Sequence, residues 1–129
     1  MKLGITGAST YRDYDHFQHV MDKISVPITL IVTGGRDGVE EMARRYARQH
    51  DLSILIHHAR TNPNLDWMRR FHLLLTADAD NILAFNYPGT HTASLLKSVA
   101  RVAGKRLNMV CLEADAVPHA IAARYGEEI

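Results

Sequence analysis

Apolar residues along the chain alternate between short continuous runs and longer stretches in which they recur every three or four positions. The continuous runs are rich in valine, isoleucine and leucine, which is typical of strands buried on both faces of a parallel sheet. The longer stretches have the spacing of an amphipathic helix. The predicted strands are Lys2–Thr6, Ile28–Val32, Leu52–Ile56, Asn81–Phe85 and Leu107–Leu112.

The helical stretches between these runs predict four helices whose apolar stripes pack against a sheet, and a further helix is predicted near Val117–Tyr125. The alternation of strands and helices predicts one α/β domain over residues 1–129, with a doubly wound parallel sheet of about five strands in the order 3-2-1-4-5 and right-handed crossovers. The stripes comprise Tyr14, Phe17, Val20, Met21 and Ile24; Val39, Met42, Ala43, Tyr46 and Ala47; Met68, Phe71, Leu74 and Leu75; and Leu95, Leu96, Val99, Ala100 and Ala103.

Three loops of small residues each follow a predicted strand and open a predicted helix: Thr6–Thr10, Thr33–Gly38 and Tyr87–Thr92. Small residues let the backbone approach a ligand closely, and the free N–H groups at a helix start favour phosphate or carboxylate. Because the carboxyl ends of parallel strands share one edge, the loops together predict a site for a nucleotide-like anion. The predicted ligand-binding residues in these loops are Gly7, Ala8, Ser9, Gly34, Gly35, Arg36, Gly38, Gly89, Thr90, His91 and Thr92.

The composition is that of an ordinary soluble globular domain. Of the 129 residues, 47% are hydrophobic and 22% charged, and 15 basic against 14 acidic residues leave a net charge of +1. This balance gives no strong signal for nucleic acid or an anionic membrane. No signal-peptide pattern and no apolar run of roughly 18 residues is seen, so a cytoplasmic location is expected. Cys111 lies in an apolar run and is predicted to be a buried thiol.

Several segments, taken in order, resemble the motifs of a known superfamily. The segments are Ile5–Tyr14, similar to GSRxFxDY; Val32–Glu40, similar to SGGAxGAD; Arg69-Arg70 with Ala79–Phe85, similar to RNxxM and ADxxIAF; and Gly89–Thr92, which falls where the pattern has GxGT. Together they resemble the SLOG superfamily of Rossmann-like nucleotide-binding domains, which includes the LOG phosphoribohydrolases and the DNA-processing protein Smf. The resemblance runs from Lys2 to about Val110 and is strongest to the small stand-alone members of phages and bacteria.

The resemblance implies a nucleotide ligand but counts against the hydrolysis that the LOG-type enzymes perform. Those enzymes carry a catalytic glutamate just after the Gly-Thr pair, and the corresponding position here, near Ser94, has no carboxylate. Glu40 replaces the usual aspartate of the second loop, and His91 replaces the last glycine of the loop after the fourth strand. The family's second catalytic element is an arginine before the third helix, a region that Arg69 or Arg70 would occupy.

The cationic candidates for holding a phosphate are Arg36 in the second loop and either Arg69 or Arg70, of which one is expected to face the site and one the solvent. Asp37 is predicted to cap the second helix, because aspartate is a preferred residue at a helix start. Tyr11 and Tyr87 are candidates for stacking on a base.

The histidines His57, His58 and His91 follow two of the predicted strands, but no carboxylate or cysteine spacing completes a set of metal ligands. No metal site is therefore predicted. A phosphate beside His91 would favour the charged imidazole, so ligand affinity is expected to rise as the pH falls.

Three functions remain open. The favoured one is binding or sensing of a nucleotide or nucleotide-derived phosphate, because the loops carry no acid-base pair. An N-glycosidic hydrolase of nucleoside monophosphates, using the displaced acids Glu40 or Asp13, is the enzymatic alternative. A scaffold without a ligand is the third. No cofactor is expected, and the apolar third and fourth helices predict a homo-oligomer.

Overall fold

The computed structural model describes residues 1–58 and 65–112, and these form five strands and four helices. The predicted helix near Val117–Tyr125 lies outside this part of the chain. The elements are β1 (Lys2–Gly7), α1 (Tyr14–Asp22), β2 (Leu30–Gly34), α2 (Val39–Gln49), β3 (Ser53–His57), α3 (Leu65–Asp78), β4 (Asn81–Asn86), α4 (His91–Ala103) and β5 (Arg106–Cys111).

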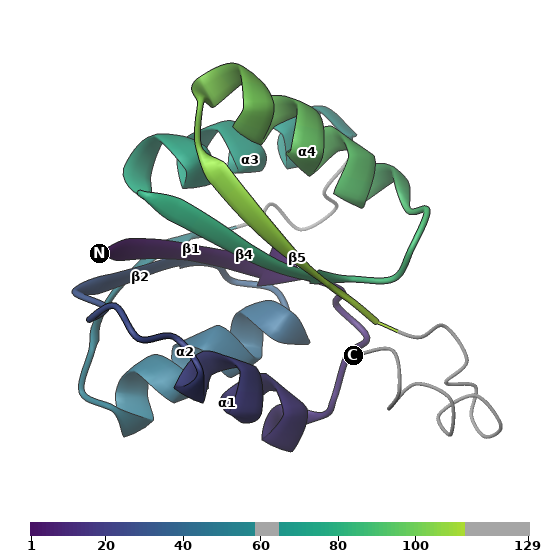
Figure 1. Ribbon diagram of the computed structural model, residues 1–129. Coiled ribbons are helices and arrows are strands. Elements are labelled where there is room, and N and C mark those ends of the chain that lie inside the picture. The colour runs from purple at the N-terminus through teal and green to yellow at the C-terminus, as the bar shows by residue number, and fades with distance from the viewer. Residues whose placement is uncertain (59–64, 113–129) are drawn as a thin grey trace, which may run out of the picture.

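The strands form one parallel sheet in the order β3-β2-β1-β4-β5, which confirms the predicted α/β fold and strand order. Helices α1 and α2 cover one face of this sheet, and α3 and α4 cover the other (Figure 1). The sheet is therefore doubly wound in the Rossmann-like manner. The two central strands, β1 and β4, pair directly and send their following helices to opposite faces (Figure 1).

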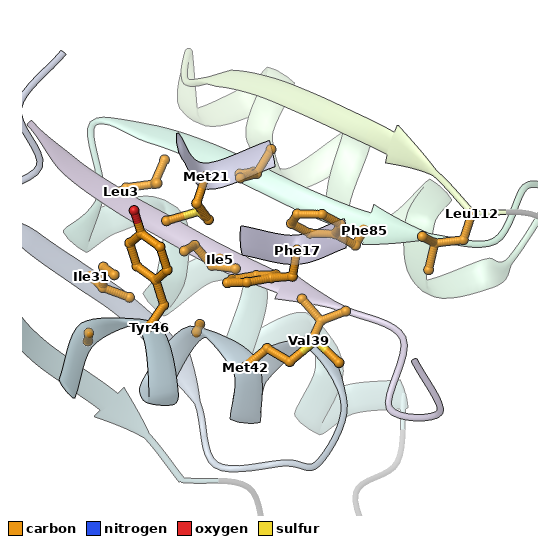
Figure 2. Packing of buried hydrophobic residues seen from close by; sticks show 13 residues of the cluster. Leu3, Ile5, Phe17, Met21, Ile31, Val39, Met42, Tyr46, Phe85 and Leu112 are labelled. Carbon is orange, nitrogen blue, oxygen red and sulfur yellow. The ribbon is translucent and has the colours of Figure 1, made fainter. Parts of the chain in front are cut away.

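Side chains that alternate along the central strands fill two separate cores. Leu83 and Phe85 of β4 point to the α1/α2 layer, where Phe85 packs on Phe17 with ring centroids 5.0 Å apart (Figure 2). Ile82 and Ala84 point to the α3/α4 layer. This period of two is the pattern of a strand buried on both faces, and it explains the continuous apolar runs of the central strands.

The outer strands are less buried than their sequences predict. The strands β3 and β5 lie at the two edges of the sheet, so each has a neighbour on one side only. Their residues alternate between exposed and half-buried positions. The prediction of a buried thiol at Cys111 is wrong, because this residue ends the edge strand β5 and is exposed.

The second strand begins and ends two residues later than predicted. Residues Thr33 and Gly34, assigned to a loop from the sequence, continue the pairing with β3, and the Thr33 hydroxyl donates to the carbonyl oxygen of Ile5 at 2.6 Å. The Thr33 hydroxyl therefore hydrogen-bonds the neighbouring strand β1 and is not directed to a ligand. This places the turn into α2 at residues 35–38.

Candidate functional site

A cleft of about 240 Å³ opens at the carboxyl ends of β1 and β4. These two strands are where the strand order reverses, the position at which doubly wound sheets hold their ligands. The wall combines hydroxyl, amide and imidazole groups with one guanidinium. The lining residues are Thr6, Gly7, Ala8, Ser9, Thr10, Arg36, Met68, His72, Asn86, Tyr87, Thr90 and Thr92.

The loop after β1 forms one wall and is fixed by contacts to the end of β4. The backbone N–H of Ala8 donates to the carbonyl oxygen of Phe85 at 2.9 Å. A Cβ atom at Gly7 would lie 2.2 Å from that same oxygen, so a side chain is excluded there. The Arg12 guanidinium also donates to the Ser9 carbonyl oxygen at 2.8 Å. The hydroxyls of Ser9 and Thr10 therefore stand on a loop with a defined path along the cleft.

The start of α2 is covered by the loop that follows β1. Gly38, with φ of +76°, is the residue at the helix cap, and a Cβ there would lie 2.3 Å from the carbonyl oxygen of Ala8. That oxygen accepts the N–H of Val39 at 3.1 Å. The prediction that Asp37 caps α2 is wrong, because Gly38 occupies the cap position and no side chain caps the helix.

Beneath the cleft lies the buried carboxylate of Glu40, with 1% of its surface exposed. It accepts hydrogen bonds from the Thr6 hydroxyl at 2.8 Å, from the backbone N–H of Arg36 at 3.1 Å and from the Arg36 guanidinium at 2.8 Å and 3.3 Å. A Cβ on Gly34 would lie 2.2 Å from Glu40 Oε1, so the carboxylate occupies the space that any other residue at this position would need.

Arg36 lies between this buried carboxylate and the cleft. Its Nη2 also contacts the carbonyl oxygen of Gly7 at 3.4 Å, whereas its Nη1 makes no hydrogen bond to a described residue. The carbonyl oxygen of Arg36 accepts from the guanidinium of Arg44 at 3.0 Å, which also bonds the carbonyl oxygen of Gly34 at 2.8 Å. The turn is thus held by two arginines, and one of them reaches the cleft.

The far wall is the start of α4. The Thr90 hydroxyl accepts the N–H of Ala93 at 3.2 Å and so caps the helix, and Thr90 and Thr92 line the cleft. The N–H groups in the first turn of a helix have no acceptor within that turn, and Thr90 takes up only that of Ala93 and that of Ser94, so this wall still offers hydrogen-bond donors. His91 is exposed and is not among the lining residues, and neither is Ser94.

His72 of α3 completes the floor of the cleft together with Met68, which lies one turn earlier on the same helix. His72 has 2% of its surface exposed, and its Nδ1 has no hydrogen-bond partner among the described residues. Burial, and secondarily the positive charge of Arg36, lower its pKa from 6.5 to about 4. The imidazole is therefore neutral at physiological pH.

Only part of the predicted set comes together in the cleft. Gly7, Ala8, Ser9, Arg36, Thr90 and Thr92 line it, whereas Gly34, Gly35, Gly38, Gly89, His91, Arg69 and Arg70 do not. Both arginines of α3 are exposed. On this helix the residues that line the cleft are Met68 and His72, and neither was predicted to be a site residue. Their separation of four positions, which puts both on one helix face, was the available signal.

Most of the remaining candidates have structural roles. Asp13 caps α1 by accepting the N–H of His16 at 3.0 Å and does not line the cleft. The Tyr11 ring stacks on Phe85, and its hydroxyl bonds His16, whereas Tyr87 does line the cleft. His57 pairs with Asp78 of α3 at 2.8 Å.

The described residues contain no group of three histidine, cysteine, aspartate or glutamate side chains arranged to hold a metal ion. Within the same part of the chain, none of the helices has the length and apolar character that crossing a membrane requires.

We predict that Glu40→Gln destabilises the protein by about 3 kcal/mol, because the amide turns a donor toward the donors of Thr6 and Arg36 and leaves a buried charge network incomplete. Glu41→Gln is the matched control, since Glu41 is exposed on the same helix turn and should change stability by less than about 0.5 kcal/mol. Urea unfolding at neutral pH measures both. Equal stability of the two variants would contradict the role given to Glu40.

The lowered pKa of His72 predicts a loss of stability in mild acid. The unfolded chain takes up a proton at its usual pKa of about 6.5, whereas the folded protein resists protonation until about pH 4. The free energy of unfolding therefore falls as the pH drops through this window, by about 2 kcal/mol between pH 7.5 and pH 5. Burial also lowers the pKa of His16, which adds to the fall.

In His72→Phe the His72 share of this loss should be absent, so the difference in unfolding free energy between pH 7.5 and pH 5 shrinks by about 2 kcal/mol. Urea titrations at the two pH values measure it. His19→Phe, at an exposed position on α1, is the matched control and should not reduce the difference by this amount. An identical loss in wild type and His72→Phe would show that His72 is hydrated in solution.

Comparison with known proteins adds no relative from which the site can be interpreted. No family model matches the chain, and no significant match is found among curated proteins or among solved structures. The function has to be inferred from the geometry of the cleft itself.

Proposed function

We propose that the chain binds or senses a small nucleotide-derived phosphate in the cleft between β1 and β4. The observation that carries this proposal is the composition of the wall. Ser9, Thr10 and Thr92 line the same cleft as the start of α4 and Arg36, and so bring hydroxyl groups and a guanidinium to one site. Hydroxyls, free backbone N–H groups and an arginine are the donors that proteins use for phosphate oxygens.

The size and charge of the cleft limit the ligand. A cavity of about 240 Å³ lies below the range of about 300–1,000 Å³ that is usual for drug-sized ligands, which favours a mononucleotide or a smaller sugar phosphate. Among the described lining residues, Arg36 is the only one with a full charge, and its ion pair with Glu40 offsets much of it. A ligand with one phosphate group suits this wall better than a polyphosphate.

Binding is favoured over cleavage because no carboxylate belongs to the described lining of the cleft. Glu40 is enclosed by its hydrogen bonds beneath the wall, and Asp13 caps a helix. A nucleoside-monophosphate hydrolase is the alternative, and it would need a general acid from outside the described lining. Release of free base from AMP or GMP by the wild-type protein would favour that alternative over binding.

Membership of the SLOG superfamily and a cytoplasmic location also stay predictions. The resemblance is supported by the doubly wound fold and by the first and fourth loops lying at one cleft. A scaffold without a ligand is disfavoured by the polar groups that converge there.

We predict that AMP, GMP or another nucleoside monophosphate binds the protein and that Ser9→Ala weakens this binding about tenfold, since a hydrogen bond to a charged group is worth about 1.5–3 kcal/mol. Ser98→Ala is the control, because Ser98 is exposed on α4 and does not line the cleft. Isothermal titration calorimetry measures the affinities, and native mass spectrometry identifies a ligand retained from the cell.

If Ser9→Ala and Ser98→Ala weaken binding equally, the ligand does not bind in the cleft. If none of the nucleoside monophosphates binds at millimolar concentration, the proposal fails.

We also propose that the chain forms a homo-oligomer through the outer surface of α3 and α4. Leu73 of α3 is 53% exposed and Val102 of α4 is 87% exposed. The two helices pack side by side in one layer, so both side chains belong to the same side of the molecule. Large apolar side chains left in water on one layer favour association with a second copy.

Sedimentation at micromolar concentration should therefore show a species heavier than the monomer. The double change Leu73→Lys and Val102→Lys should shift it to the monomer without loss of folded structure, because both side chains are already exposed. A monomer in the wild-type protein contradicts the proposal.

A further inference from the structure

His72 is a buried polar group whose hydrogen bonding is incomplete. It lies on α3, lines the cleft and is 2% exposed, and its Nδ1 has no partner among the described residues. Buried polar atoms without a partner are rare in folded proteins, because each costs about 1–3 kcal/mol. Because His72 itself lines the cleft, a group bound there can reach the imidazole and supply the missing hydrogen bonding.

One other buried nitrogen in the described residues lacks a partner, and it differs in its surroundings. It is Nε2 of His16, on α1 in the opposite layer, and His16 does not line the cleft. The other nitrogen of that ring bonds the Tyr11 hydroxyl, and the ring packs edge-on against Phe85. His16 is thus fixed within the protein, whereas the His72 side chain borders a space that a ligand can enter.

The chemistry of a neutral imidazole selects the kind of group that it meets. Buried beside the guanidinium of Arg36, His72 stays uncharged at neutral pH, so it offers one donor and one acceptor. A phosphate oxygen accepts only and is better served by Arg36 and the start of α4 across the cleft. A hydroxyl both donates and accepts, and it pairs with either tautomer of the ring.

We propose that His72 hydrogen-bonds a ribose hydroxyl of the bound ligand, so that the cleft recognises a sugar phosphate and discriminates against inorganic phosphate. This inference rests on the proposed function and adds the sugar to it. Met68, one turn away on the same helix, supplies an apolar contact beside the ring, which suits the carbon face of a sugar. The phosphate then lies toward Arg36 and Thr92, and the sugar toward α3.

The test compares AMP, 2′-deoxy-AMP, 3′-deoxy-AMP and inorganic phosphate on three forms of the full chain: wild type, His72→Phe and His72→Asn. Phenylalanine keeps the ring and removes both nitrogens. Asparagine keeps a polar atom at about the position of Nδ1, because its amide extends about as far from the backbone. His19→Phe, on the exposed side of α1, is the matched control.

In calorimetry, His72→Phe should bind AMP about tenfold more weakly than wild type, and His72→Asn should recover most of the loss. Inorganic phosphate should bind all forms alike. On wild type, one of the deoxy nucleotides should bind about tenfold more weakly than AMP. On His72→Phe, that deoxy nucleotide and AMP should bind equally well, which is the coupling that a direct contact requires. The urea midpoint of ligand-free His72→Phe should not fall, since the unpaired nitrogen is gone.

Each remaining outcome overturns the inference. AMP affinity of His72→Phe within twofold of wild type removes His72 from the site, and equal weakening of AMP and inorganic phosphate assigns it to the phosphate instead. If wild type binds phosphate but AMP no better, the sugar contact fails and the phosphate site survives. If wild type binds neither, the proposed function fails as well.

A measurement on the wild-type protein covers the case in which His72→Phe does not fold. The ¹⁵N resonances of the His72 ring should shift on addition of AMP but not of inorganic phosphate, while those of His19 stay in place. An unchanged His72 ring in the presence of saturating AMP overturns the inference.

Discussion

The position of the Glu40 carboxylate is the constraint on which the rest of the site depends. A buried anion must have its lone pairs satisfied, and here Thr6 of β1 and the backbone and side chain of Arg36 satisfy them. This requirement fixes the end of β1 against the turn into α2. It also requires glycine at position 34, because the carboxylate lies where a Cβ would be. One side chain thus determines the shape of two loops.

The same ion pair sets the electrostatic character of the cleft. With its charge largely offset by Glu40, Arg36 makes the cleft only weakly positive, and its guanidinium is held in a fixed orientation by the carboxylate and by Gly7. Binding of the proposed ligand would then depend on the geometry of hydroxyls and N–H groups more than on long-range attraction. This agrees with a chain whose net charge is +1 and with a neutral His72 at the floor.

The sheet was predictable because its signals are local. Continuous apolar runs in β1 and β4, with helical spacing between them, imply buried parallel strands, and the Thr6–Thr10 and Tyr87–Thr92 loops follow directly from the two central ones. Edge position is a property of the whole sheet, so the exposure of Cys111 was not readable from its run. The covering of α2 by Ala8 is a contact between distant segments, which is why Asp37 was wrongly expected to cap that helix.

The direct pairing of β1 with β4 joins the first strand of the chain to one that follows β2, β3 and three helices. Contacts between segments so distant in sequence slow the folding of a domain, since a long loop must close before they contribute. The cleft forms only when β1 and β4 have paired, because its two main walls are the segments that follow these two strands. A ligand bound there would contact the loops after both β1 and β4 and would therefore slow the separation of these two strands during unfolding.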